Sequence, residues 1–271
     1  MTMAENSSSS TDIPLISLRQ ICKSFGGIHA LENVSFDLNR GDVVGLVGDN
    51  GAGKSTLIKT LAGAHDPTSG DILLEGAPQT LSPPSQAQKL GIETVYQDLS
   101  LINSFNAAEN FFLGREVAFG GGPALFRFMR RKAMADTAIK GLEDLNIDIP
   151  GVRTKAVERM SGGQRQIIAI ARGAFWGHKL LLLDEPTAAL GVRESREVLE
   201  LIRRLSSKGL TIMMVTHNLE HLWQVCNRVV VMRRGRKVAD LASSETNLEE
   251  VVAYITGAKQ PAGTLAQGAS A

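Results

Sequence analysis

The chain has 271 residues, of which 43% are hydrophobic, and a formal net charge of +1 at neutral pH. This length and apolar content can bury a full core, and we expect one large domain rather than two small ones. Because charges of both signs are interspersed, there is no broad basic field, which argues against a duplex nucleic acid as the main partner but is compatible with a local basic patch. No apolar stretch approaches the roughly 20 residues that a membrane-spanning helix needs, so we expect any role at a membrane to come through another protein.

The cysteines and the two ends of the chain carry no visible chemistry. Cys22 and Cys226 are far apart and lack neighbouring metal ligands, so we predict neither a disulfide nor a zinc site and expect a reducing cytoplasm. The serine-rich residues 1–13 and the Gly/Ala-rich residues 257–271 hold too little apolar content to pack, and we predict that both are disordered. The single folded domain is then expected over residues 14–256.

Two kinds of strand pattern follow along the chain. Residues 15–25 and 34–38 alternate apolar and polar side chains, which indicates antiparallel strands with one buried face, and another strand is predicted over 71–75. Elsewhere the apolar runs are continuous and indicate strands covered on both faces. These runs occupy residues 43–47, 92–96, 180–183, 211–215 and 229–232. We therefore predict an α/β fold with a mostly parallel central sheet and an antiparallel β flank.

The most informative segment follows the apolar run 43–47 and leads into a helical pattern. Its residues are Gly48, Asp49, Asn50, Gly51, Ala52, Gly53, Lys54, Ser55 and Thr56. A run G-x-x-x-x-G-K-S/T between a strand and a helix is typical of a phosphate-binding loop (P-loop), because glycines let backbone N–H groups turn inward and the helix N-terminus adds partial positive charge. Lys54 can then meet the β- and γ-phosphates, and Ser55 can supply an oxygen to Mg²⁺. We predict a nucleoside triphosphate as ligand; a glycine-rich turn with a coincidental lysine is the alternative.

The buried-strand runs stop between residues 99 and 160. A helical pattern spans about 124–145, after a Gly-Gly-Gly-Pro segment at 120–123. We predict an inserted α-helical subdomain over 98–160, which divides the core into residues 14–97 and 161–256.

A second glycine segment opens the helical pattern that begins near Ile167. It consists of Ser161, Gly162, Gly163 and Gln164. A serine and two glycines at the start of a helix can bind phosphate. An ordinary serine N-cap with flexible glycines explains the segment equally well. Further along, apolar residues recur with helical spacing over 194–207, which predicts an amphipathic helix.

Polar residues follow three of the predicted buried strands. Asp184 and Glu185 end the run 180–183, and strand ends face the ligand crevice in open α/β sheets. Asp184 can hold Mg²⁺ through water, and Glu185 can orient or deprotonate the water that attacks the γ-phosphate; an acidic turn that caps the next helix is the alternative. His217 follows 211–215 and can contact the γ-phosphate or hold Glu185, and Gln97 follows 92–96 and can coordinate metal or water. Structural roles for both are the alternatives.

These motifs, in this order and spacing, resemble the ATP-binding-cassette (ABC) ATPases over about residues 16–255. The resemblance implies a glutamine loop at Gln97, a switch histidine at His217 and a signature at 161–164. It also implies that two domains face each other head to tail, so that Ser161 and Gly163 act on the nucleotide bound by the other copy. Phe25 matches the position at which this family stacks an aromatic ring on adenine; a core residue at a strand end is the alternative.

Two positions depart from the family pattern. Met160 replaces the usual leucine at the start of the signature, a volume-conserving change. Gly191 replaces an aspartate that commonly helps to couple the two nucleotide sites across the dimer, and we expect weakened coupling.

Within the family, residues 95–101, 108–116 and 185–192 resemble the ATPases of bacterial importers of ribose, xylose and fructose. The resemblance implies a homodimer with Mg²⁺ and ATP on the cytoplasmic face of the inner membrane. It hydrolyses ATP to drive a separate permease. A periplasmic binding protein delivers the sugar to this permease. A soluble cassette ATPase, for instance in iron–sulfur cluster assembly, is the alternative, whereas the 161–164 signature argues against a P-loop kinase or GTPase.

Overall fold

The computed structural model describes residues 13–119 and 128–260. The predicted disorder at the two ends falls mainly on residues 1–12 and 261–271, which lie outside this part of the chain. In chain order the strands are β1 (Ile16–Phe25), β2 (Ile28–Leu38), β3 (Val43–Gly48), β4 (Ser69–Leu74), β5 (Ala77–Pro78), β6 (Ile92–Val95), β7 (Ala118–Phe119), β8 (Phe128–Met129), β9 (Leu180–Asp184), β10 (Thr211–Val215), β11 (Arg228–Arg233) and β12 (Arg236–Ala242). The helices are α1 (Lys54–Leu61), α2 (Pro84–Lys89), α3 (Ala107–Phe111), α4 (Arg131–Asp144), the 3₁₀ helix η2 (Val157–Arg159), α5 (Gly162–Trp176), α6 (Val192–Ser207), α7 (Leu219–Val225) and α8 (Leu248–Thr256).

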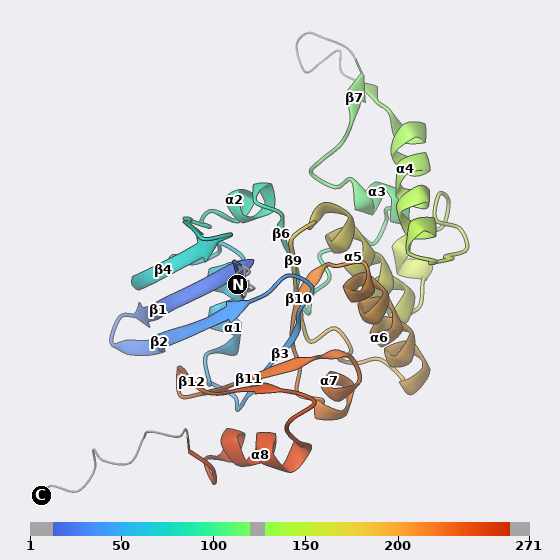
Figure 1. Ribbon diagram of the computed structural model, residues 1–271. Coiled ribbons are helices and arrows are strands. Elements are labelled where there is room, and N and C mark those ends of the chain that lie inside the picture. The colour runs from blue at the N-terminus through green and yellow to red at the C-terminus, as the bar shows by residue number, and fades with distance from the viewer. Residues whose placement is uncertain (1–12, 120–127, 261–271) are drawn as a thin grey trace, which may run out of the picture.

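A six-stranded central sheet has the order β12-β11-β3-β10-β9-β6. Its strands β11, β3, β10, β9 and β6 are mutually parallel, and only β12 runs antiparallel. A second, four-stranded sheet of order β2-β1-β4-β5 is antiparallel and lies beside it (Figure 1). The predicted parallel sheet with an antiparallel flank is therefore confirmed.

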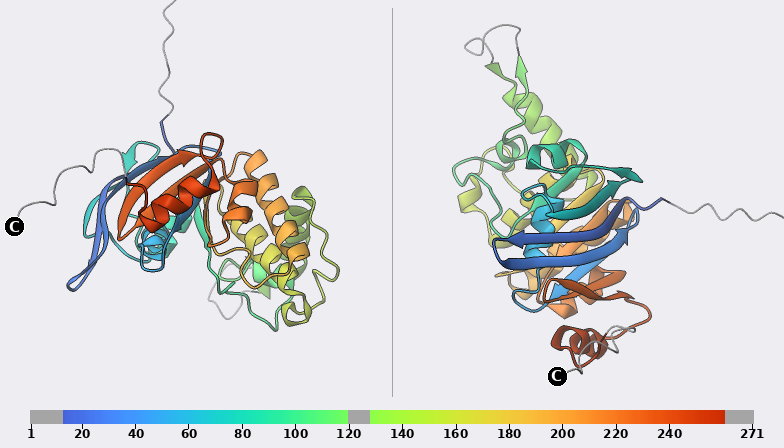
Figure 2. Two further views of the ribbon diagram at one scale, coloured as in Figure 1. Left: turned by 90° about the horizontal axis from the view of Figure 1, so that it is seen from below. Right: turned by 90° about the vertical axis from the view of Figure 1, so that its left-hand side faces the viewer.

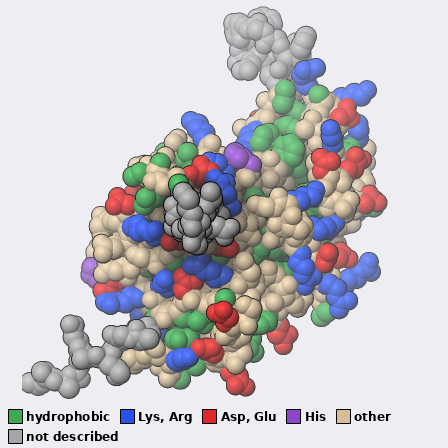
Figure 3. Space-filling view, viewed as in Figure 1, with side chains coloured by type: hydrophobic (Ala, Val, Ile, Leu, Met, Phe, Trp, Pro, Cys, Tyr) green, Lys and Arg blue, Asp and Glu red, His purple; other side chains and the backbone are tan. Residues whose placement is uncertain are grey.

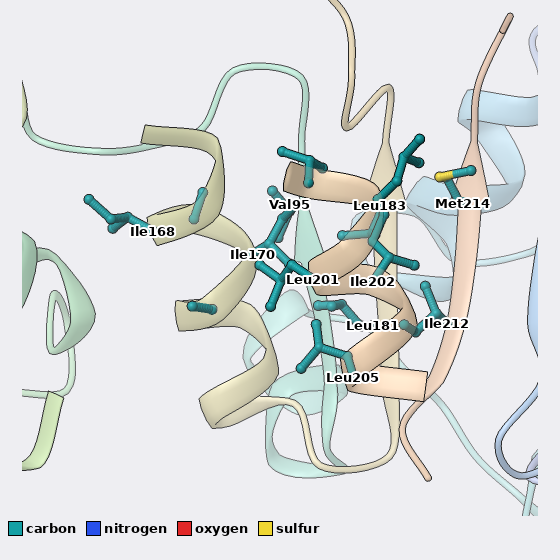
Figure 4. Packing of buried hydrophobic residues seen from close by; sticks show 14 of the residues in the cluster. Val95, Ile168, Ile170, Leu181, Leu183, Leu201, Ile202, Leu205, Ile212 and Met214 are labelled. Carbon is teal, nitrogen blue, oxygen red and sulfur yellow. The ribbon is translucent and has the colours of Figure 1, made fainter. Parts of the chain in front are cut away.

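Continuous apolar strands of the central sheet bury both faces, as their sequences predict. In β9, Leu180 and Leu182 pack in one hydrophobic cluster with α1 and the antiparallel sheet. Leu181 and Leu183 point to the opposite face and pack with α5 and α6. Figure 4 shows this second layer, in which both leucines lie against the apolar side chains of α6. Each fully buried leucine contributes about 1.5–3 kcal/mol to folding, so the two helical layers are tied to opposite faces of one sheet.

The segment between β6 and α5 forms a protrusion of α3, α4, η2 and the short hairpin β7–β8 at one end of the molecule (Figures 1 and 2). A capping box starts α3: Asn106 Oδ1 accepts from the Glu109 N–H, and the Glu109 carboxylate accepts from the Asn106 N–H. Helix α5 packs against this segment and against the central sheet. The division at 97/98 and 160/161 stays a prediction.

The helix predicted over about 124–145 is wrong at its start. The helix α4 begins only at Arg131, and Phe128–Met129 is a strand that pairs with Ala118–Phe119. The Arg130 N–H donates to the Val117 carbonyl at 2.9 Å, which extends this pairing up to the helix. Residues 124–127 of the prediction lie outside the described part. Hairpin pairing with β7 has overridden the helical pattern here, because strand preference depends on the neighbours that a segment can pair with.

Candidate functional site

The strand order brings the predicted residues to one edge of the central sheet. Strand β10 lies between β3 and β9, and its Val215 is level with Leu46 on one side and Asp184 on the other. The P-loop, His217 and Glu185 therefore leave neighbouring strands at the same carboxyl edge. Strand β6 is next to β9 and ends at Val95, so Gln97 leaves from the same edge at its outer side. Ligands of open α/β sheets bind at such an edge.

Close backbone approach explains two glycines of the P-loop. A Cβ on Gly48 would lie 2.2 Å from the Met232 carbonyl oxygen, and one on Gly53 would lie 2.6 Å from that of Ala30. Both residues also have positive φ, 151° and 100°, respectively. Only glycine fits such positions without displacing backbone. The loop of residues 48–53 is thus locked against β11 and the antiparallel sheet, and α1 begins directly after it.

Lys54 is held inside the P-loop. Its Nζ donates to the carbonyl oxygens of Gly48, at 2.8 Å, and Asp49, at 3.0 Å. Burial lowers the pKa of Lys54, against the opposing charges of Glu185, Asp49 and Asp184. An ammonium group has three donors, so one N–H is left for a further oxygen atom, such as that of a phosphate.

The two carboxylates at the end of β9, Asp184 and Glu185, have pKa values that their surroundings change. Burial raises the pKa of Glu185, and the nearby His217 offsets only part of this effect. Burial also raises the pKa of Asp184, although the positive charges of Lys59, Lys54 and His217 act in the opposite direction. The Oε1 atom of Glu185 is buried and accepts no hydrogen bond from any described residue. Carboxylates whose pKa is raised by burial beside other charged groups mark candidate functional sites.

Three residues that are predicted to contact the nucleotide or its metal ion are exposed at this edge. His217 has a side chain that is 58% exposed, with Nε2 3.2 Å from Glu185 Oε1 but not aligned for a hydrogen bond. Ser55 and Gln97 are also exposed. Within the described residues, neither side chain makes a hydrogen bond. All three side chains can therefore reach a bound molecule.

The Ser161–Gln164 segment forms a capping box that begins α5. Ser161 Oγ accepts from the Gln164 N–H at 3.2 Å, and Gln164 Oε1 accepts from the Ser161 N–H at 3.1 Å. The ordinary N-cap is therefore present, and the Gly162 and Gly163 N–H groups lie in the first helical turn. Helix α5 packs on the face of the central sheet opposite α1. No described hydrogen bond joins this segment to the P-loop of the same chain.

Phe25 lies at the end of β1 with its ring partly in solvent, 44% exposed. The ring packs edge to face with His65 at a centroid distance of 5.3 Å, and the Lys23 ammonium lies 5.1 Å from its centroid. The Lys23 Nζ in turn donates to the Asp66 carbonyl at 2.6 Å. Phe25 is therefore not a core residue, and its orientation is supported from two sides.

Sequence reasoning missed one contact at this edge. His221 Nδ1 lies 3.0 Å from Thr187 Oγ1, which joins α7 to the turn after Glu185. The available sequence signal was slight: a second histidine four residues after His217, with a hydroxyl two residues after Glu185.

The P-loop between β3 and α1, with carboxylates at a nearby strand end, defines an α/β P-loop nucleoside triphosphatase. The sequence profile of the ABC transporter family matches residues 31–188. The chain belongs to the ABC transporter family, in which it is an ATP-binding cassette with ATPase activity.

Relatives and solved structures agree with this assignment. The chain is 45% identical to the xylose/arabinose import ATP-binding protein XylG of Sulfolobus acidocaldarius, over 89% of this chain and 94% of that protein. It is 43% identical to the fructose import ATP-binding protein FrcA of Rhizobium meliloti, over 92% and 96%, respectively. It is 38% identical to the ribose import ATP-binding protein RbsA of Yersinia pestis over 90% of this chain, but spans only 47% of that protein.

Solved cassettes share the fold. A nucleotide-free ATP-binding cassette from an ABC transporter superposes with a TM-score of 0.75 at 24% identity, covering 90% of this chain and 95% of that one. The cbiO1 protein of Clostridium perfringens, part of the ABC transporter complex cbiONQ, gives 0.73 at 27% identity, with coverages of 88% and 92%. The predicted family and fold are thereby confirmed.

Proposed function

We propose that this chain is the ATP-hydrolysing subunit of a monosaccharide importer and drives uptake through a separate membrane permease. The observation that carries the proposal is its match to two sugar-import ATP-binding proteins, at 45% and 43% identity, over nearly the full length of both chains. A cassette need not touch the transported molecule, so the class of cargo rests on this likeness alone.

The geometry of the sheet edge supports distinct roles in ATP hydrolysis. The free N–H of Lys54 and the backbone of residues 48–56 would hold the β- and γ-phosphates. Glu185 would accept a proton from the attacking water, for which its Oε1 is suited, being buried and without a hydrogen bond from any described residue. His217 would contact the γ-phosphate or keep Glu185 in place. Phe25 would stack on adenine through the exposed part of its ring.

The same edge offers oxygen donors that fit Mg²⁺. The hydroxyl of Ser55, the carboxylate of Asp184 and the amide oxygen of Gln97 are hard ligands of the kind that Mg²⁺ prefers, directly or through water. Burial raises the pKa of Asp184, and a bound cation would favour its ionised form. When bound, Mg²⁺ would neutralise charge on the phosphates.

We infer that two copies sandwich ATP head to tail. Each α5 begins on the far face of the sheet from its own α1, and the N–H groups of Gly162 and Gly163 in its first turn make no hydrogen bond within the described residues. Ser161, Gly162, Gly163 and Gln164 of one copy would thus serve the P-loop of the other. ATP then favours the closed dimer, and loss of the γ-phosphate removes the contacts that favour it.

A groove between the core and the inserted helices suits the permease. It has a volume of about 250 Å³ and is lined by Tyr96, Leu99, Phe111, Arg115, Arg172 and Trp176. Its three aromatic rings would suit the apolar side of a short segment, whereas Arg115 is paired with Glu93 and Arg172 donates to the carbonyl oxygens of Leu99 and Ser100. Figure 3 shows hydrophobic side chains gathered over α3 nearby, whereas charges of both signs are interspersed elsewhere on this face.

This docking would place the chain on the cytoplasmic face of the inner membrane, with a periplasmic sugar-binding protein as an indirect partner. Among the described helices, none combines the length and apolarity needed to cross a bilayer. No nucleic acid is part of the proposed function.

Uptake measurements test the proposal. In a strain that lacks this gene, uptake of a panel of radiolabelled monosaccharides is expected to fall for one or a few sugars and to return with the intact gene but not with a Lys54→Ala variant. Unchanged uptake of every sugar, together with a stable complex with soluble proteins only, would instead identify a non-transport cassette ATPase. Monomeric protein at saturating MgATP with hydrolysis blocked would contradict the sandwich.

A further inference from the structure

Two segments of the sheet edge are joined by three contacts. The Glu185 N–H donates to the Val215 carbonyl at 2.9 Å, His217 Nε2 lies 3.2 Å from Glu185 Oε1, and His221 Nδ1 lies 3.0 Å from Thr187 Oγ1. The first two act at Glu185 itself. The third is the only one that joins the side chain of a helix residue to the turn after Glu185.

The turn that carries Glu185 is strained. Glu185 and Ala189 both have positive φ, 53° and 59°. Non-glycine residues in this region persist only where surrounding contacts hold them. Within the turn, the Ala188 N–H donates to the Glu185 carbonyl at 3.0 Å, which keeps the residues between them in one compact unit. A contact to any member of this unit therefore bears on the direction in which Glu185 points.

Helix α7 is held in place at its start by a cap and along its length by packing on the central sheet, so it can support such a contact. Asn218 caps it by accepting from the His221 N–H at 3.0 Å, and the Asn218 N–H donates to Thr216 Oγ1 at 3.0 Å. Leu222 is fully buried and packs so closely on β3 that a Cβ on Gly45 would lie 2.3 Å from it. His221, between the cap and this anchor, is thus fixed relative to the central sheet.

Thr187 depends on His221. Thr187 is only 7% exposed, and among the described residues His221 is the hydrogen-bond partner of the Thr187 hydroxyl. A buried hydroxyl that loses its partner bears a desolvation cost. Because a hydroxyl can both donate and accept, the contact persists in either tautomer of the imidazole. It therefore sets position rather than passing a proton.

We propose that His221 is a positioning residue for ATP hydrolysis, which through Thr187 fixes the turn that carries Glu185. The inference rests on the proposed role of Glu185 as general base. His221 does not touch Glu185, so its removal leaves the base present but allows the turn to relax. Misplacement of a catalytic group by a fraction of an ångström mainly lowers the rate of the chemical step.

Steady-state ATPase measurements on the purified full chain test this. For His221→Ala and for Thr187→Val, kcat is expected to fall about ten-fold, which corresponds to about 1.4 kcal/mol. The KM for ATP and the affinity for ATP without Mg²⁺ are expected to stay within about two-fold, because the P-loop is untouched. His221→Asn, whose amide atoms occupy the place of Nδ1, and Thr187→Ser, which keeps the hydroxyl, are expected to restore most of the activity.

A matched control and a double variant separate positioning from loss of folding. Glu220→Ala makes the same truncation at an exposed neighbour on α7 and is expected to leave kcat and the melting temperature unchanged. The variant that combines His221→Ala with Thr187→Val is expected to lose about ten-fold, not about a hundred-fold, because both changes break one contact.

Each failure points to a different cause. If the wild-type protein hydrolyses ATP and His221→Ala has the same kcat, the inference is overturned and the proposed function stays intact. Additive losses in the double variant, or equal losses of kcat and ATP affinity, would also overturn it. No hydrolysis by the wild-type chain, alone or with its permease, would contradict the proposed function itself.

Discussion

His217 Nε2 lies 3.2 Å from Glu185 Oε1, an oxygen atom that is buried and accepts no hydrogen bond from the described residues. The imidazole is largely in solvent, whereas the carboxylate is only 16% exposed. The pair thus places one buried, incompletely satisfied acceptor at the edge of the sheet where Lys54 also lies. A carboxylate of this kind is costly to keep ionised unless a ligand or water completes its contacts.

Glu185→Gln is expected to lower the ATPase kcat by about 10²–10⁴-fold, the usual contribution of a general base, and to preserve ATP binding. Single-turnover hydrolysis and nucleotide binding by fluorescence would check both. Hydrolysis at a rate near that of the wild-type protein would rule out Glu185 as the base.

The same variant is expected to raise the free energy of unfolding at neutral pH. Because burial raises the pKa of Glu185 above its ordinary value of 4.5, the ionised carboxylate costs stability at higher pH, and this cost disappears as the pH falls through the raised pKa. The stabilising effect of Glu185→Gln should therefore vanish in acid. Urea unfolding at neutral and acidic pH measures the difference.

Gly53→Ala is expected to destroy the P-loop geometry, whereas Gly51→Ala is its matched control. A Cβ on Gly53 would lie 2.6 Å from the Ala30 carbonyl oxygen, but one on Gly51 would meet nothing within 4 Å. Both have positive φ, so Gly51→Ala carries only the backbone cost of about 1–2 kcal/mol. Thermal unfolding and ATP titration should show a larger loss for Gly53→Ala; equal losses would mean that close packing at Gly53 is unimportant.

Gly191→Asp is expected to strengthen coupling between the two ATP sites. Gly191 is the N-cap of α6, with φ of −69°, and its N–H donates to Glu194 Oε2 at 3.1 Å. A Cβ here meets only that oxygen, at 3.6 Å, so aspartate fits and changes helix stability by no more than a few tenths of a kcal/mol. The Hill coefficient for ATP hydrolysis should rise; an unchanged coefficient would show that Gly191 does not weaken coupling.

Asp240→Asn is expected to destabilise the fold by about 1–3 kcal/mol at neutral pH. The Arg228 guanidinium donates to both oxygens of Asp240, at 2.6 and 2.8 Å. Burial alone would raise the pKa of Asp240, but the hydrogen bond and charge of Arg228 hold it below its ordinary value of 3.8. This stability is therefore fully present above about pH 4 and lost as the pH falls through the lowered pKa.

The difference between Asp240→Asn and wild type should accordingly shrink in acid, as measured by denaturant unfolding. The exposed pair Arg193–Glu197 provides the control, since Glu197→Gln is expected to change stability by less than about 0.5 kcal/mol. A pH-independent effect of Asp240→Asn would contradict the ion-pair explanation.

Phe25→Ala is expected to raise the Kd for ATP about ten-fold, since stacking a base on an aromatic ring contributes about 1–3 kcal/mol. Phe25→Tyr should keep near wild-type affinity. The loss should be similar for GTP, because stacking does not read the base edge. Isothermal titration with both nucleotides would check this, and an unaltered Kd would exclude Phe25 from the adenine site.

The sequence by itself determined the P-loop, the continuous apolar strands and the polar residues at the strand ends, because each depends on local spacing and local backbone conformation. It failed near Phe128, where pairing with Phe119 replaced the helical pattern, and it did not reveal the contact of His221 with Thr187. Only the tertiary structure decided that β10 lies between β3 and β9 and that α1 and α5 cover opposite faces. Strand order and helix placement depend on packing between segments more than 100 residues apart, for example β3 and β10, which no local pattern encodes.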